Sequence, residues 1–295
     1  MPRTATPTTP PPSMAPPPAN EKAAPNPTKG ATIVPLDAKF PPPRIVLNAV
    51  EGFGKTSAGA YAPNPVLLMA EGESGALTLM GSNLIPQVPG ATISSWPELM
   101  ATIDALCAGT DAYGTLVLDA ISGFEKLCHT HVCSRDFAGE WGEKGFLSYH
   151  KGYEVATNDW LLMLAALDRL RATKGTTIFM LSHSQVRPHR NPVGEDFDRY
   201  VADCHPKTWA PTAKWADCVL FGNFLAVIDK GRTGKERAKG MGGTERVIYT
   251  TRRDAWDAKN RYNMPEFLQL DTNPANNWDT IWNAIIGKGT THGTT

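Results

Sequence analysis

The sequence has no net charge, few cysteines and no long apolar run, and each of these absences excludes a class of protein. Its 29 basic residues balance 29 acidic residues, so any attraction to nucleic acid has to come from a local patch. Five cysteines, an odd number in 295 residues, fit a reducing compartment better than a disulfide framework. No run approaches the roughly 18 apolar residues that span a bilayer, and the start of the chain carries no apolar export signal. We therefore expect a cytoplasmic protein that does not contact membranes.

Proline is concentrated at the N-terminal end of the chain. Residues 1–43 contain 14 of the 25 prolines and few large apolar side chains. Such a segment has few backbone donors and too little apolar surface to offset the entropy of ordering, so we predict a disordered tail over 1–43. Glycine and threonine over 288–295 predict a second, flexible tail. The 41% hydrophobic content then supports one large α/β core over 44–287.

Short apolar runs alternate with helical patterns through this predicted core. Strands that are separated by helices imply a mostly parallel sheet that is covered by helices on both faces. The strands are expected at 44–48, 66–70, 115–119, 176–182, 218–221, 224–228 and 247–250. The helices are expected at 55–61, 97–107, 121–133, 153–173 and 278–286.

A glycine-rich turn lies between the first predicted strand and the first predicted helix. It fits the phosphate-binding pattern Gly-x-x-x-x-Gly-Lys-Ser/Thr, except that Ala49 replaces the first glycine. In such a loop, backbone N–H groups surround phosphates at a helix start, Lys55 reaches the terminal phosphates and Thr56 holds Mg²⁺. We therefore predict a site for ATP and Mg²⁺; the alternative is a glycine-rich turn with a solvated lysine. The predicted nucleotide-binding residues are Glu51, Gly52, Phe53, Gly54, Lys55, Thr56 and Ser57.

Hydrolysis requires a second acid for the metal and a group that activates water. Asp119 ends the third predicted strand, where a carboxylate would point at Mg²⁺; the alternative is a cap for the next helix. Glu71 ends the second strand and is the candidate catalytic base, with Glu73 as an alternative; either acid is also explained as a solvated loop residue. His183 ends a later strand, where it would sense the γ-phosphate or simply be solvated.

Several further motifs lie along the predicted core. They are Pro63-Asn64-Pro65, Tyr149-His150-Lys151-Gly152-Tyr153, Leu181-Ser182-His183-Ser184, Trp215-Ala216-Asp217 and Ala258-Lys259-Asn260-Arg261. With the phosphate loop and Leu118-Asp119, their order resembles a RecA-like P-loop ATPase core, and more closely phage-encoded proteins of the Sak-type single-strand annealing group. This resemblance covers roughly residues 44–270. It implies ATP hydrolysis with Mg²⁺, single-stranded DNA as a partner, self-assembly into a ring or filament, and a location in the host cytoplasm.

The resemblance also assigns roles to particular residues. In RecA-like and DnaB-like ATPases the acid that follows the second strand activates water, which implies Glu71 here. In DnaB-like rings a Lys-x-Arg pair reaches the γ-phosphate on the neighbouring subunit, and this pair falls on Lys259 and Arg261. A guanidinium that a neighbour supplies neutralises transition-state charge only after assembly. The usual glycine after the pair is absent, because Tyr262 follows, and the alternative is a basic pair on an exposed turn.

Two basic segments are candidates for a nucleic-acid interface. Residues 230–261 carry ten Lys or Arg against four Asp or Glu, and the glycines among them predict a hairpin whose basic side chains neutralise phosphates. Residues 185–209 combine basic with aromatic side chains, which suits stacking on single-stranded bases. Solvated basic loops without a partner are the alternative. The predicted nucleic-acid contacts are Arg187, Arg190, Lys230, Arg232, Lys235 and Arg237.

These predictions favour an ATP-dependent DNA-recombination protein that binds single-stranded DNA and promotes strand annealing as an oligomer. A DnaB-like helicase core or helicase loader is the first alternative, and a nucleotide-dependent switch without nucleic acid is the second. The proline-rich tail is a candidate contact for a partner such as a single-strand-binding protein. Cys128 and Cys133 flank two histidines, but their spacing fits buried thiols better than a zinc site.

Overall fold

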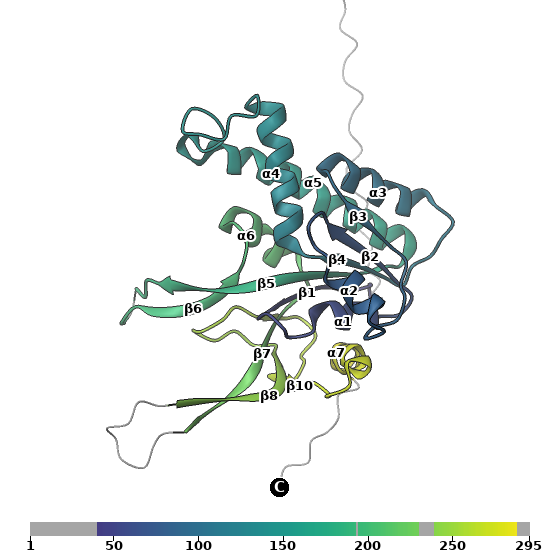
Figure 1. Ribbon diagram of the computed structural model, residues 1–295, viewed down its shortest axis with the longest axis vertical. Coiled ribbons are helices and arrows are strands. Elements are labelled where there is room, and N and C mark those ends of the chain that lie inside the picture. The colour runs from purple at the N-terminus through teal and green to yellow at the C-terminus, as the bar shows by residue number, and fades with distance from the viewer. Residues whose placement is uncertain (1–39, 193, 230–238, 288–295) are drawn as a thin grey trace, which may run out of the picture. The chain divides into compact units, whose positions relative to one another are not determined.

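The computed structural model describes residues 40–192, 194–229 and 239–287 (Figure 1). The predicted tails lie outside the described residues, apart from 40–43. Four of the predicted nucleic-acid contacts also lie outside them: Lys230, Arg232, Lys235 and Arg237. Among the helices that are described, none combines the length and the apolar character needed to cross a membrane.

The centre of the fold is a sheet in the order β10-β8-β7-β1-β5-β4-β2-β3, with β6 paired to β5 and β9 paired to β7. The six strands from β7 to β3 in this order run parallel, whereas β6, β8, β9 and β10 pair antiparallel to their neighbours. The strands are β1 Arg44–Ala49, β2 Pro65–Ala70, β3 Gly90–Ile93, β4 Thr115–Asp119, β5 Thr177–His189, β6 Phe197–Ala202, β7 Cys218–Asp229, β8 Lys239–Tyr249, β9 Lys259–Asn260 and β10 Phe267–Gln269.

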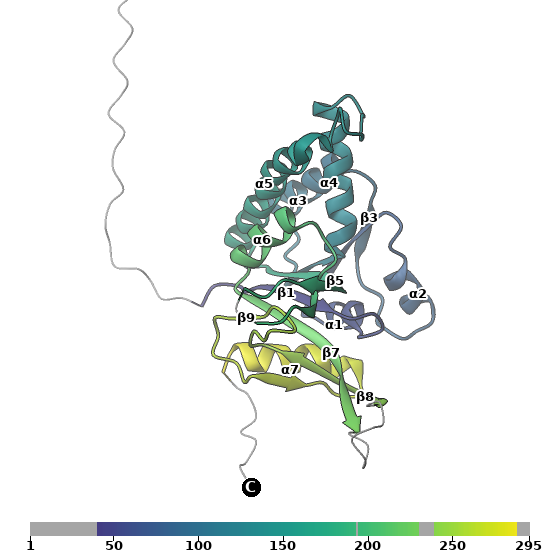
Figure 2. The same ribbon diagram turned by 90° about the vertical axis from the view of Figure 1, so that its left-hand side faces the viewer.

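Helices cover both faces of the sheet, and Figure 2 shows α3, α4, α5 and α6 on one side with α7 on the other. The helices are α1 Lys55–Ala60, α2 Gly75–Gly81, α3 Trp96–Ala108, α4 Ile121–Asp136, α5 Lys151–Lys174, α6 Pro206–Trp215 and α7 Asn277–Ile285, with the 3-10 turns η1 Ser148–His150 and η2 Pro274–Asn276. Side chains of a strand point to alternate faces. On β1, Val46 therefore packs under α3–α5, while Ile45 and Leu47 pack against the α1 and α7 side.

This architecture confirms the predicted α/β class, with a mostly parallel sheet that is flanked by helices. The two strands predicted at 218–221 and 224–228 are one continuous strand, β7. The short elements α2, β3, α6, β6, β9 and β10 were not predicted, because each buries too few residues to give a clear periodic pattern.

Two long strands set the surroundings of the glycine-rich loop that follows β1. Ala49, the last residue of β1, lies opposite His183 on β5 and opposite Gly222 on β7. Both neighbours continue past this point, and they lead into the antiparallel pairs β5–β6 and β7–β8. Figure 1 shows both pairs projecting away from the helical layers. The loop after β1 therefore lies between the points where the β5–β6 and β7–β8 hairpins leave the parallel part of the sheet.

Candidate functional site

The loop that follows β1 adopts a backbone that depends on two glycines. Gly52 and Gly54 have φ angles of 69° and 95°, in the left-handed region that side chains with a Cβ rarely adopt. Ala49, which replaces the first glycine of the pattern, is the last residue of β1 and has no positive φ. A Cβ is compatible with that position, so the departure from the pattern leaves the loop intact.

The N–H groups of this loop are unused. In the described part of the chain, no acceptor takes the N–H of any residue from Gly52 to Ser57. The first backbone hydrogen bond at the start of α1 runs from Ala58 N to Gly54 O at 3.0 Å. Free donors at a strand-to-helix turn are the feature by which phosphate is bound.

Lys55 is a buried cation without an ion-pair partner among the described residues. Its side chain is 7% exposed, and Nζ donates to the carbonyl oxygens of Ala49 and Val50, both at 3.1 Å. Burial lowers the pKa of the Lys55 ammonium, and nearby carboxylates oppose that effect only in part. An ammonium held this way gains strongly from an anion, so the loop fits the phosphates of a nucleotide.

Thr56 and Asp119 meet at the carboxyl ends of β1 and β4. The Thr56 hydroxyl donates to Asp119 Oδ2 at 2.6 Å. Burial raises the pKa of the Asp119 carboxyl, while the Thr56 hydroxyl and the charges of His183 and Lys55 act in the opposite direction. Two oxygen donors beside a phosphate loop match the preference of Mg²⁺ for few protein ligands together with substrate phosphates. These two residues would hold the metal.

His183 joins the same group through the order of the strands. Its strand, β5, lies between β1 and β4, so His183 stands between the glycine-rich loop and Asp119. His183 is among the charges that lower the pKa of the Asp119 carboxyl. The structure thus brings together Lys55, Thr56, Asp119 and His183.

The two candidate acids after β2 have different surroundings. Glu71 donates its backbone N–H to Ile93 O at 2.8 Å, and its side chain is exposed. The Glu73 side chain is half-buried, and its carboxylate is among those that raise the pKa of Lys55. Both acids therefore stay candidates, and Glu73 is the one whose charge acts on the loop.

The Lys-x-Arg pair lies where the parallel strands begin, at the opposite end of the strands from the glycine-rich loop. Lys259 Nζ donates to the carbonyls of Ala213, Lys214 and Ala216 at 2.9, 2.8 and 2.6 Å, so all three of its donors satisfy the C-terminal end of α6. Arg261 is 51% exposed, and it makes one ion pair, with Asp217 at 3.1 Å. Of the two, only Arg261 has donors to offer.

This placement decides which nucleotide Arg261 could reach. Asp217 precedes β7, which starts beside the beginning of β1, whereas Lys55 follows the end of β1. The two ends of the six-residue strand β1 are about 17 Å apart at the usual rise of a strand. That distance exceeds the length of an arginine side chain, so Arg261 cannot contact a phosphate bound at its own loop.

Arg187 and Arg190 lie on the β5–β6 hairpin. Arg187 is exposed, lies four residues beyond His183 on the same strand, and pairs in register with Arg199. Arg190 is exposed directly after the end of β5. Arg199 itself is buried in an ion pair with Asp257, so its guanidinium is not available to a ligand.

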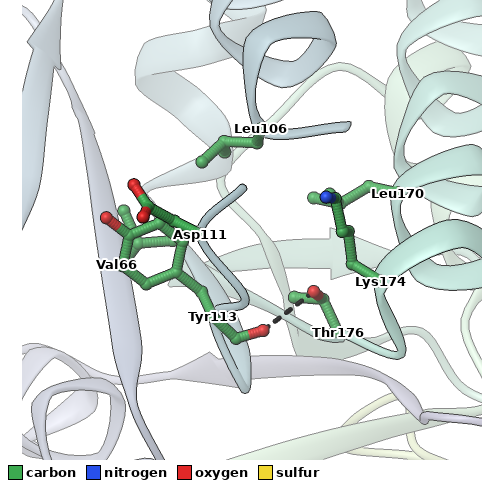
Figure 3. Close-up of a pocket in the computed structure, with 7 residues that line it drawn as sticks. All are labelled: Val66, Leu106, Asp111, Tyr113, Leu170, Lys174 and Thr176. Carbon is green, nitrogen blue, oxygen red and sulfur yellow. Dashed lines mark hydrogen bonds between the residues drawn. The ribbon is translucent and has the colours of Figure 1, made fainter. Parts of the chain in front are cut away.

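A small cavity lies far from this site, at the beginnings of β2, β4 and β5 (Figure 3). Val66, Tyr113 and Thr176 are among its lining residues, and the Thr176 hydroxyl donates to Tyr113 O at 2.9 Å. Its volume of about 10 Å³ is close to the minimum for one water molecule. It has no room for a nucleotide.

The five cysteines are all free thiols. Cys128 and Cys133 are buried on α4, and Cys128 Sγ contacts Ala156 O at 3.6 Å. His129 packs against the rings of Phe146 and Tyr153. Over the described ranges, no three His, Cys, Asp or Glu side chains converge in a way that could hold a metal ion.

Two residues beside these groups had no predicted role at the site. Asp217 joins Arg44, Arg171 and Arg261 at one edge of the sheet, and Arg246 on β8 contacts the glycine-rich loop. Asp217 lies in a motif that carries the resemblance, but its partner Arg261 is 44 residues away. Arg246 and its partner Phe53 are 193 residues apart, and only the pairing of strands brings them together.

Three comparisons with known proteins show what the chain resembles. No curated protein matches the chain significantly. Among solved structures, a crystal structure of the RadB recombinase has a TM-score of 0.42 and 12% sequence identity, over 80% of this chain and 90% of that chain. The model of a family described as AAA domain, whose members are typically ATPases, matches residues 41–262. Since that match spans the phosphate loop, Asp119 and the Lys-x-Arg pair, the chain belongs to the AAA domain family.

Proposed function

We propose that this protein is an ATP-hydrolysing DNA-recombination protein that binds single-stranded DNA and promotes strand annealing as an oligomer. The observation that carries the proposal is the position of the phosphate loop between the roots of the β5–β6 and β7–β8 hairpins. Exposed Arg187 and Arg190 on the first hairpin supply phosphate contacts at the same edge as the nucleotide site. A nucleotide switch without a nucleic-acid partner would not need them.

At the nucleotide site, each residue has a role that follows from its surroundings. Lys55 and the free N–H groups bind the phosphates of ATP, and Thr56 and Asp119 hold Mg²⁺, which supplies charge neutralisation when bound. His183 stands between the loop and the hairpin that carries Arg187, so it is the candidate link between the phosphates and DNA. Arg261 completes the site on a neighbouring subunit, because its own nucleotide is out of reach. A role for Lys259 there would require its bonds to α6 to break.

The acid that orients the attacking water is Glu71 or Glu73, and a pair of amide variants distinguishes them. The variant at the catalytic position should lose about a hundred-fold or more in ATP turnover while binding ATP normally, because the amide cannot accept a proton. The other variant should turn over ATP at the wild-type rate. Turnover is measured with saturating ATP and Mg²⁺, and ATP binding with a fluorescent analogue. If both Glu71→Gln and Glu73→Gln were fully active, neither acid would be the base.

Single-stranded DNA should stimulate ATP turnover, and charge reversal at Arg187 and Arg190 should remove that stimulation. Each reversed charge replaces an attraction to a phosphate by a repulsion, so anisotropy titrations with a labelled oligonucleotide should show roughly ten-fold or greater weakening. The effect should shrink as salt is raised, since salt screens phosphate contacts. Turnover without DNA should not change.

The control is Arg169→Glu, an exposed arginine on α5 that pairs with Asp104 and lies away from both hairpins. DNA binding that is unchanged in Arg187→Glu/Arg190→Glu would remove this hairpin from the interface, and turnover that is indifferent to DNA would favour the nucleotide switch. Annealing of complementary oligonucleotides, compared with unwinding of a forked duplex, then distinguishes the recombination protein from a helicase core.

A further inference from the structure

Arg246, on β8, reaches across the fold to the phosphate loop. Its Nη1 donates to Phe53 O at 3.3 Å, and its Nη2 donates to Asp271 O and Thr272 O, both at 3.2 Å. Within the described residues, no carboxylate lies within ion-pair distance of this guanidinium. All of its partners are neutral carbonyls, so surface ion pairing does not account for its position.

The carbonyl that Arg246 contacts belongs to the peptide group between Phe53 and Gly54. A trans peptide is planar, so its C=O and N–H point in opposite directions. When Arg246 holds the oxygen, the Gly54 N–H points away from β8. That N–H has no acceptor in the described part of the chain, which leaves it available to a ligand.

This peptide needs such a restraint, because a glycine with positive φ lies directly after it and another lies just before Phe53. Gly52 and Gly54 can adopt either sign of φ at little cost, so the peptides between them reorient more easily than those of other residues. The Phe53 ring is fixed, since it is buried against Gly222 and lies edge-to-face with Phe224 at 6.3 Å. These contacts hold the ring and not the peptide that follows it, and Arg246 contacts the oxygen of that peptide.

Gly54 also makes room for the guanidinium. A Cβ at this position would lie 2.9 Å from Arg246 Nη1, closer than such atoms approach each other. The absent side chain therefore permits the backbone angle and lets the guanidinium take this position without a shift.

We propose that Arg246 is a positioning residue of the nucleotide site, which holds the Phe53–Gly54 peptide so that the Gly54 N–H is presented to the phosphates. This inference rests on the proposed binding of ATP at the loop. Arg246 does not contact the reacting atoms; it acts through the orientation of one peptide. Without it, the peptide would turn freely, and part of the binding energy of the nucleotide would be used to order it.

The test compares Arg246→Ala and Arg246→Lys with the wild-type protein in titrations with a fluorescent N-methylanthraniloyl derivative of ATP. Arg246→Ala should weaken binding about ten-fold, the effect expected for one hydrogen bond with a charged partner. Arg246→Lys, which keeps a positive charge and a donor, should recover part of the loss. Arg253→Ala is the matched control, because Arg253 is exposed and pairs with Glu266 away from the loop. It should bind as the wild type does.

Thermal unfolding without nucleotide separates positioning from simple structural support. If Arg246→Ala unfolds at a lower temperature but binds the analogue as tightly as the wild type, Arg246 only fastens the 271–272 segment to β8, and the proposal is wrong. If Arg246→Ala does not fold, Arg246→Lys decides: binding equal to the wild type overturns the proposal, and weaker binding supports it. Lys55→Ala serves as a reference, since a wild-type protein that binds no analogue, or a Lys55→Ala that binds normally, would refute the nucleotide site itself.

Discussion

Lys55→Ala is expected to abolish nucleotide binding, with an affinity at least about a hundred-fold below that of the wild type, because charged hydrogen bonds to phosphate are worth roughly 1.5–3 kcal/mol each. The ammonium is buried, contacts only the carbonyls of Ala49 and Val50, and has no carboxylate partner among the described residues. Burying this charge destabilises the free protein, and a bound phosphate offsets that destabilisation. Removing it should therefore leave stability unchanged or raised, while ATP turnover is lost.

The measurement is a titration with the fluorescent ATP analogue together with ATP turnover. Lys144→Ala, at an exposed lysine in the α4–α5 connection, is the control and should behave as the wild type. Burial lowers the pKa of Lys55, so the charged form is lost at a lower pH than for an ordinary lysine. Nucleotide affinity of the wild type should accordingly fall as pH rises toward that lowered pKa. Wild-type affinity in Lys55→Ala would exclude this loop as the phosphate site.

Asp119→Asn should uncouple nucleotide binding from magnesium. Asparagine has the same shape and keeps an acceptor for the Thr56 hydroxyl, but it lacks the negative charge that a divalent ion requires. We expect turnover with Mg²⁺ to fall about a hundred-fold or more, since the developing phosphate charge is no longer neutralised. Binding of ATP without Mg²⁺ should be unchanged or tighter, because a carboxylate is removed from beside the phosphates.

Binding titrations with and without Mg²⁺, and turnover as a function of Mg²⁺ concentration, measure both effects. Asp104→Asn provides the comparison, as Asp104 is exposed on α3 and pairs with Arg169. Burial raises the pKa of Asp119, so its charge is costly in the free protein, and the neutral variant should not unfold more easily than the wild type. If Asp119→Asn kept the full magnesium dependence, the metal would be held elsewhere.

Local patterns were sufficient to predict the phosphate loop, the strand that precedes Glu71 and the strand that ends at Asp119. Each of these is a contiguous apolar run followed by a polar residue or a glycine, so its location depends only on neighbours in sequence. The direct contact between Thr56 and Asp119 then follows from parallel strands that end at one edge. The position of β5 between β1 and β4, which brings His183 to Asp119, does not follow from any single segment.

Long-range pairing accounts for what the sequence did not predict. Arg246 contributes to a basic excess in the sequence, yet its guanidinium lies against the phosphate loop because β8 pairs with β7 beside β1. Lys259 forms part of the Lys-x-Arg motif, yet its ammonium caps α6, because β9 pairs with β7 near the end of that helix. Basic residues carry no signal that distinguishes a ligand contact from a structural cap, so tertiary contacts alone assign them.

Lys55 and Arg261 lie at opposite ends of the parallel strands, and this separation affects how many nucleotide sites are complete in an assembly. If each subunit supplies its loop to one neighbour and its Arg261 to the other, the interface is heterologous, and it either closes into a ring or extends as a helix. An open chain of subunits always has one terminal loop without an arginine, so short chains waste a larger share of their nucleotide sites than long ones. Turnover per subunit should then rise with protein concentration, and a closed ring would have no idle end.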